Sequence, residues 1–131
     1  MAPLRILLAD DNDEILAEIR ELLDEGFEII GTVRNGEDAV EAVRRFDPDV
    51  VVLDIAMPIL DGIQAASQVR DSQARTKILF LTIQENPEYV SAAFAAAASG
   101  YVTKLSLLSD LTHAIREVIE GRTFLSSSLR R

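Results

Sequence analysis

Five polar residues of this sequence each stand at the carboxyl end of a short apolar run. They are Asp10, Asp11, Asp54, Thr82 and Lys104. Runs such as VVVL at residues 50–53 are typical of strands that are buried on both faces. In a parallel sheet the carboxyl ends of the strands share one edge, and ligands bind at that edge. The sequence therefore predicts that three carboxylates, a hydroxyl and an ammonium group lie close together.

These side chains suit the transfer of a phosphoryl group. Crowded carboxylates repel one another unless a cation lies among them, and hard oxygen ligands favour Mg²⁺. A carboxylate can attack a phosphoryl group to form an acyl phosphate, whose equatorial oxygens need counter-charges from several directions. Mg²⁺ held by Asp11 and Asp54 would neutralise one oxygen and Lys104 a second, while the Thr82 hydroxyl would donate to a third. We expect Asp54 to be the phosphate acceptor because it follows the central strand.

Each apolar run alternates with a stretch of helical spacing. The expected strands are residues 5–9, 27–33, 50–53, 77–82 and 101–103. Three of the expected helices cover residues 37–46, 61–70 and 86–98. The first begins at 12 or 13 and ends near 26, and the last begins between 106 and 109 and ends at 120. Five β-α repeats predict an α/β fold, a doubly wound parallel sheet with helices on both faces.

The composition is typical of one globular domain and excludes several kinds of site. The absence of cysteine excludes disulfides, thiolate metal sites and cysteine nucleophiles. No window of about 18 apolar residues suggests a membrane helix, and the N-terminus does not resemble a secretory signal. A net charge of −9 without a basic stripe argues against direct binding of nucleic acid. We expect a cytoplasmic protein with no membrane contact.

Four motifs together resemble the receiver domain of two-component response regulators. They are LLADDN (7–12), VVLDIAMPILDG (51–62), LFLT (79–82) and GYVTK (100–104). The second half of the chain is similar to receivers of the NarL/FixJ kind, which a LuxR-type helix-turn-helix domain usually follows. The resemblance implies a five-stranded (βα)5 flavodoxin-like fold with strand order 2-1-3-4-5. The receiver would span residues 1–122, with 123–131 as a C-terminal tail or the start of a linker.

The same resemblance implies a role for each residue around the phosphate. Asp54 would be the phosphorylated aspartate, and Asp10 and Asp11 would hold Mg²⁺ together with it. The main-chain carbonyl of Ala56 would be a further metal ligand. Lys104 would pair with the phosphoryl group.

The resemblance also implies a switch and an output. Thr82 and Tyr101 would form the switch pair, in which the hydroxyl moves toward the phosphate and the ring changes between exposed and buried positions. The donor would be a sensor histidine kinase. The output would be homodimer formation on phosphorylation, or control of transcription through an effector domain that is absent from this sequence. DNA would be contacted only through that effector domain. A stand-alone receiver that acts through protein contacts is the alternative.

Two other classes of protein fit less well. A Mg²⁺-dependent phosphatase of the haloacid-dehalogenase type needs a second aspartate two residues after the nucleophile, where this sequence has Ala56. An interaction module that works without phosphorylation would not need the acids together with Thr82 and Lys104. We therefore expect a signalling domain rather than an enzyme. Ile83 is larger than the alanine or glycine of many receivers, and we expect it to slow loss of the phosphoryl group.

Overall fold

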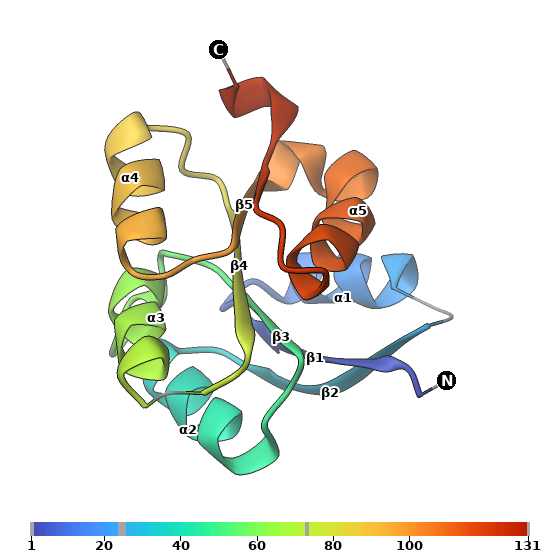
Figure 1. Ribbon diagram of the computed structural model, residues 1–131, viewed down its shortest axis with the longest axis vertical. Helices are drawn as coiled ribbons and strands as arrows, with labels where there is room; N and C mark the ends of the chain where they lie inside the picture. The colour runs from blue at the N-terminus through green and yellow to red at the C-terminus, as the bar shows by residue number, and fades with distance from the viewer. Residues whose placement is uncertain (1, 24–25, 73, 131) are drawn as a thin grey trace.

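Strands and helices alternate along the chain (Figure 1). The computed structural model describes residues 2–23, 26–72 and 74–130. The strands found there are β1 (Leu4–Ala9), β2 (Phe27–Val33), β3 (Val50–Leu53), β4 (Lys77–Thr82), β5 (Gly100–Thr103) and β6 (Phe124–Leu125). The α-helices found there are α1 (Asp13–Leu22), α2 (Gly36–Phe46), α3 (Gly62–Asp71), α4 (Pro87–Ala95) and α5 (Leu107–Ile119). The α/β alternation predicted from the sequence is confirmed.

The described strands form one parallel sheet in the order β2-β1-β3-β4-β5-β6. The predicted order of the first five strands is correct, but the prediction of a five-stranded sheet misses the edge strand β6. In β6, Phe124 pairs with Gly100 and Leu125 with Tyr101. The Phe124 side chain is buried, which gives this strand its hydrophobic driving force. A pair of apolar residues is too short to show the alternation by which strands are recognised.

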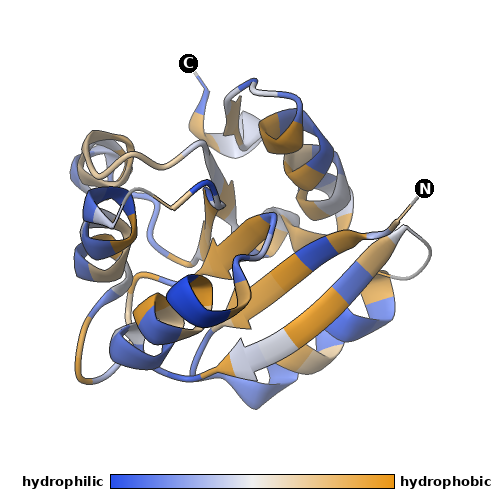
Figure 2. Cartoon of the chain, turned by 60° about the horizontal axis from the view of Figure 1, so that its bottom comes forward, coloured by the Kyte–Doolittle hydropathy of each residue, from blue (hydrophilic) through white to orange (hydrophobic). Residues whose placement is uncertain are grey.

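Helices cover both faces of the sheet (Figure 1). Alternate side chains of β1 belong to different cores: Leu7 and Ala9 pack with α2, α3 and α4, whereas Ile6 and Leu8 pack with α1 and α5. Figure 2 shows hydrophobic strands between helices that carry hydrophilic residues. The four residues of β3, Val50–Leu53, are all buried, and each such side chain contributes about 1.5–3 kcal/mol of transfer free energy. The central strand is thus a rigid support for the residue that follows it.

Two helices end earlier than their sequence pattern suggests. The last turn of α4 is closed by Ala97, whose φ of 72° is left-handed, and by a hydrogen bond from the Ala98 N–H to the Ala93 carbonyl (3.1 Å). A run of alanines does not reveal this turn, and it ends the helix before Ala98. The helix α1 ends at Leu22, ahead of the expected end near Gly26. Within residues 2–23, 26–72 and 74–130, no helix is long and apolar enough to cross a membrane.

Candidate phosphoryl and metal site

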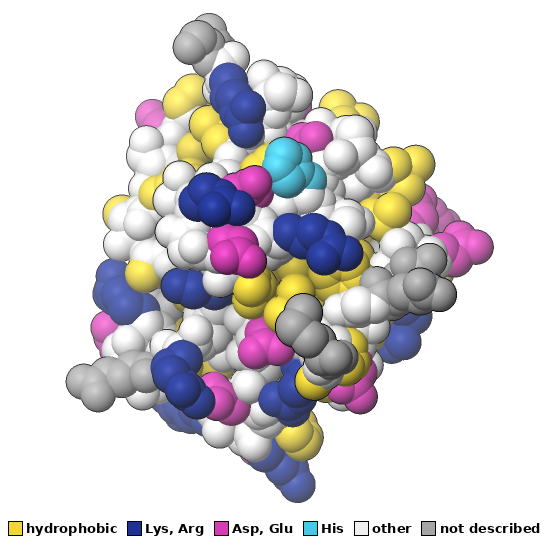
Figure 3. All heavy atoms as spheres, turned by 45° about the vertical axis from the view of Figure 1, so that its right-hand side comes forward, with side chains coloured by type: hydrophobic (Ala, Val, Ile, Leu, Met, Phe, Trp, Pro, Cys, Tyr) yellow, Lys and Arg dark blue, Asp and Glu magenta, His cyan; other side chains and the backbone are white. Residues whose placement is uncertain are grey.

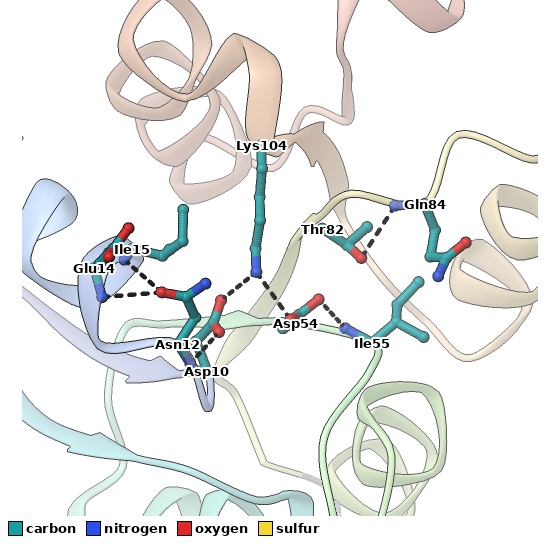
Figure 4. Close-up of polar contacts among 9 residues, drawn as sticks. All are labelled: Asp10, Asn12, Glu14, Ile15, Asp54, Ile55, Thr82, Gln84 and Lys104. Atoms are coloured by element: carbon teal, nitrogen blue, oxygen red, sulfur yellow. Dashed lines mark hydrogen bonds and ion pairs between the residues drawn. The ribbon is translucent and has the colours of Figure 1, made fainter.

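The carboxyl ends of β1, β3, β4 and β5 meet at one edge of the sheet (Figure 4). Asp10 follows β1, Asp54 follows β3, Thr82 ends β4 and Lys104 follows β5. Asp11, next to Asp10, is exposed at the same edge. The structure thus gathers residues that are far apart in the sequence, as the prediction of a parallel sheet requires.

Lys104 lies between two carboxylates. Its Nζ is 2.9 Å from Asp10 Oδ2 and 3.0 Å from Asp54 Oδ2. The three side chains are largely excluded from solvent, with exposed fractions of 11% for Lys104, 4% for Asp10 and 6% for Asp54. Both contacts are charge-assisted hydrogen bonds in a site that water screens little. The ammonium group therefore joins the ends of β1, β3 and β5.

The carboxylate of Asp54 is oriented by the backbone around it. Its Oδ1 accepts a hydrogen bond from the Ile55 N–H (2.7 Å), and its own N–H donates to the Ala9 carbonyl (2.9 Å). The chain returns past this point at Gly62, where a Cβ would overlap the carbonyl oxygen of Asp54. These contacts fix the carboxylate, and they leave Oδ2 as the oxygen that faces Lys104.

The acids at this edge form a set of oxygen donors. One carboxylate oxygen from each of Asp10, Asp11 and Asp54 lies within 4.8 Å of the others. Asp10 is held in place because its Oδ1 accepts a hydrogen bond from the Asn12 N–H (2.9 Å). Mg²⁺ takes oxygen ligands, keeps several of its waters and is usually bound by only a few protein groups. A set of three carboxylates with one exposed member fits that ion.

Burial and ion pairing shift the proton affinities of this site. Burial raises the pKa of Asp10 above its ordinary value, and the hydrogen bond from Lys104 opposes part of that rise. Burial alone would lower the pKa of Lys104, but its hydrogen bonds to Asp10 and Asp54 outweigh burial and raise it. Lys104 is therefore held firmly as a cation at neutral pH.

Gln84 connects the two predicted switch residues, although nothing in the sequence singles it out. Its N–H donates to Thr82 Oγ1 (3.4 Å), and its carbonyl accepts from the Tyr101 hydroxyl (2.7 Å). Tyr101 is fully buried, and burial raises its pKa. The ring thus lies in the buried one of the two positions expected of a switch residue here. Gln84 uses only main-chain atoms for this bridge, so its side chain gives no signal.

The loop after Asp54 contains a strained residue. Ile59 has a φ of 72°, which is unfavourable for a β-branched side chain, and 75% of its surface is exposed. The loop is fixed at its end by a hydrogen bond from the Gly36 N–H to the Leu60 carbonyl (2.9 Å).

Ala56 lies at the start of this loop and is exposed. Ile83, which follows Thr82, is also exposed.

Comparisons with known proteins agree in sequence and in fold. The family model described as "Response regulator receiver domain" matches residues 6–116. The chemotaxis protein CheY of Halobacterium salinarum is 38% identical over 88% of this chain and 96% of its own length. The uncharacterized transcriptional regulatory protein YvfU of Bacillus subtilis is 34% identical over 96% of this chain, which spans only 64% of YvfU. A LuxR-family two-component response regulator from Aurantimonas sp. SI85-9A1 has a crystal structure with a TM-score of 0.92 and 31% identity, over 98% of this chain and 93% of that one.

Proposed function

This chain belongs to the family of response regulator receiver domains, the signalling domains of two-component systems, and we propose that it accepts a phosphoryl group on Asp54 with the help of Mg²⁺. The donor is the phosphohistidine of a sensor histidine kinase in the cytoplasm. The domain then holds the group for a time as a signal. It does not turn over substrates in solution.

One observation carries this proposal. The Asp54 carboxylate stands at the end of the buried strand β3, 3.0 Å from a lysine that also contacts Asp10, with Asp11 beside them. A carboxylate that only capped a turn would not need a buried ammonium group and two further acids. The cluster supplies a nucleophile, a counter-charge and oxygen ligands for a cation within one small volume.

The transfer step uses the oxygen of Asp54 that the backbone leaves free. Oδ2 attacks the phosphorus in line with the leaving nitrogen, so that an O–P bond forms as the P–N bond breaks. The electron pair of that P–N bond leaves with the imidazole of the donor, which is neutral when its other nitrogen carries a proton. Lys104 then transfers its contact from the Asp54 carboxylate to a phosphoryl oxygen, and the Thr82 hydroxyl donates to another.

Asp10, Asp11 and Asp54 would hold Mg²⁺, with the Ala56 carbonyl as a further ligand. When bound, the ion neutralises charge on the phosphoryl oxygens. The switch follows from the same contacts, since movement of Thr82 toward the phosphate withdraws its hydroxyl from Gln84, which also holds Tyr101. Phosphorylation thereby changes the balance between two arrangements of the β4–α4 loop and of Tyr101.

We further propose that the output is control of transcription through a helix-turn-helix domain outside this sequence, by way of a phosphorylation-dependent homodimer. The similarity to a transcriptional regulatory protein over 96% of this chain supports this output. The similarity to a chemotaxis protein over 96% of that protein's length supports the alternative, a receiver that acts by protein contacts alone. A phosphatase is disfavoured because the position of its acid is occupied by Ala56.

Incubation with acetyl phosphate and Mg²⁺, followed by Phos-tag electrophoresis, tests the proposal. We expect a retarded band for the natural sequence and for D71N, because Asp71 is an exposed acid on α3. D54A should give no retarded band. If neither acetyl phosphate nor any histidine kinase phosphorylates the chain, the proposal is wrong. Turnover of p-nitrophenyl phosphate would instead indicate a phosphatase.

A further inference from the structure

The C-terminal segment 124–129, here named the strap, is built into the fold beside β5. The Phe124 N–H donates to the Ser99 carbonyl (3.1 Å), and the Ser126 N–H donates to the Tyr101 carbonyl (3.0 Å). The Thr103 N–H in turn donates to Ser126 Oγ (3.1 Å). Ser126 is fully buried. The strap therefore pairs the main-chain hydrogen-bonding groups along the open edge of β5, through both its own main chain and the Ser126 side chain.

Side chains fasten the strap to α5 on one side. The centroid of the buried Phe124 ring lies 5.4 Å from that of His113 in a T-shaped arrangement. The Arg130 guanidinium, just after the strap, lies over the Phe124 ring at 5.4 Å from its centroid. Just before the strap, Arg122 pairs with Glu117 of α5. Figure 3 shows this face of the molecule, where acidic and basic side chains surround the histidine. These contacts hold the first half of the strap.

The other end of the strap lies beside the β4–α4 region. A pocket of about 300 Å³ that opens to solvent is lined by Ser128 and Leu129 of the strap and by Glu85, Pro87 and Val90. Leu129 packs against the core but is only partly buried, so this end of the strap buries less apolar surface than Phe124 does. A strand of two residues also has few hydrogen bonds with which to resist opening. The strap is thus among the parts of the molecule that open at low free-energy cost.

Two chains of contacts join the strap to the phosphoryl site. The first runs along β5, where Thr103, which holds Ser126, immediately precedes Lys104, which holds Asp54. The second passes through Gln84, which contacts Thr82 and Tyr101, and the Tyr101 carbonyl is itself bound by Ser126. Gln84 is next to Glu85, which lines the same open pocket as Leu129.

We infer that the strap is a latch, a segment whose pairing with β5 responds to phosphorylation. It is closed on β5 when Asp54 is unphosphorylated, and a phosphoryl group on Asp54 weakens this pairing. This inference rests on the proposed function. The phosphoryl group draws the Lys104 ammonium away from its place between two carboxylates, which shifts the end of β5, where the Thr103 N–H holds Ser126. It also draws away the Thr82 hydroxyl, which releases the Gln84 N–H and alters the loop that shares a pocket with Leu129. Any domain attached beyond residue 131 would receive the change through this segment.

Linkage requires the coupling to be reciprocal. If the phosphorylated site favours an open strap, then a change that weakens the closed strap must favour the phosphorylated site. The variant S126A removes the oxygen that accepts from the Thr103 N–H. S127A is a matched control, because Ser127 is the neighbouring strap residue and is exposed.

Amide hydrogen exchange, followed by NMR with and without beryllofluoride and Mg²⁺ as the phosphate mimic, tests the latch directly. We expect the Ser126 amide to exchange at least about tenfold faster when the mimic is bound, in keeping with the usual size of coupling between sites. The Lys77 amide, which donates to the Asp49 carbonyl at the amino end of β4, should not change. Unchanged or slower exchange at Ser126, with the mimic seen to bind at Asp54, overturns the latch and leaves the proposed function intact. Failure of both the mimic and acetyl phosphate to react overturns both.

The variants give a second, independent readout. We expect S126A to bind beryllofluoride about three- to fivefold more tightly than the natural sequence, which corresponds to the loss of one hydrogen bond from the closed state. S127A should bind with unchanged affinity. General loss of structure would weaken binding by S126A, so tighter binding cannot arise from misfolding. Equal or weaker binding by a folded S126A contradicts the latch.

Discussion

Removal of the Lys104 ammonium group tests whether this lysine neutralises the buried acids. In K104M the side chain keeps a similar length, but Asp10 and Asp54 lose the charge that lies 2.9 and 3.0 Å from their oxygens. Removing one partner of a buried ion pair typically costs about 3–5 kcal/mol, because the other charge is left buried and unpaired. The exposed acid Asp11 shows that the site is partly open to water, so we expect about 3 kcal/mol.

Urea denaturation, followed by circular dichroism because the chain has no tryptophan, measures this loss in buffer with a chelator. The control is R75M, which removes a cation that is 91% exposed and 3.5 Å from Asp47. This surface pair should be worth less than about 1 kcal/mol. If K104M costs no more than R75M, Lys104 is not the counter-charge described here.

The pH dependence of K104M gives a second check. The pKa of Asp10 is already raised by burial, and K104M removes the hydrogen bond that lowers it. A carboxyl group with a raised pKa in the folded state binds its proton more tightly there than in the unfolded chain, so the folded variant gains stability as the pH falls. The deficit of K104M relative to the natural sequence should shrink by about 1 kcal/mol between pH 7 and pH 5. A deficit that is constant over this range would refute the reasoning.

Three further predictions concern strain, metal and lifetime. I59G should stabilise the fold by about 1 kcal/mol in urea denaturation, because glycine tolerates the φ of 72° found at this position. A97G should gain less stability, because alanine is not β-branched. A loss of stability in I59G would contradict the left-handed backbone at residue 59. Millimolar Mg²⁺ should raise the thermal midpoint of the natural sequence and of D71N but much less that of D11N, and an equal rise in all three would exclude the proposed ligand set. I83A should lose its phosphoryl group faster than the natural sequence in a gel-based decay assay, and an equal or slower loss would remove Ile83 from the account.

Much of the site follows from the sequence because a parallel sheet has one functional edge. Once residues 50–53 are taken as a buried strand, Asp54 must emerge at the carboxyl edge, and the same reasoning places Asp10, Thr82 and Lys104 there. The distances then depend only on neighbouring strands, which lie about 4.8 Å apart. That is why residues from four separate strands could be brought together without a structure.

Other features depend on contacts that leave no pattern in the sequence. The strand β6 has only Phe124 and Leu125, and its presence is decided by burial against β5 rather than by its own periodicity. The turn at Ala97 takes a conformation that glycine usually marks, so a run of alanines hides it. Gln84 acts through its main chain, which is the same for every residue. Each of these is a tertiary effect on a short segment.

The central claim is that Asp54 itself carries the phosphoryl group. The direct measurement is reduction of the phosphorylated chain with borohydride, which converts an aspartyl phosphate to homoserine, followed by mass spectrometry of its peptides. The structure predicts homoserine at position 54 and nowhere else, with none in a sample treated without Mg²⁺. Homoserine at position 10 or 11 would contradict this claim. So would a phosphorylated chain in which residue 54 is still aspartate after borohydride treatment.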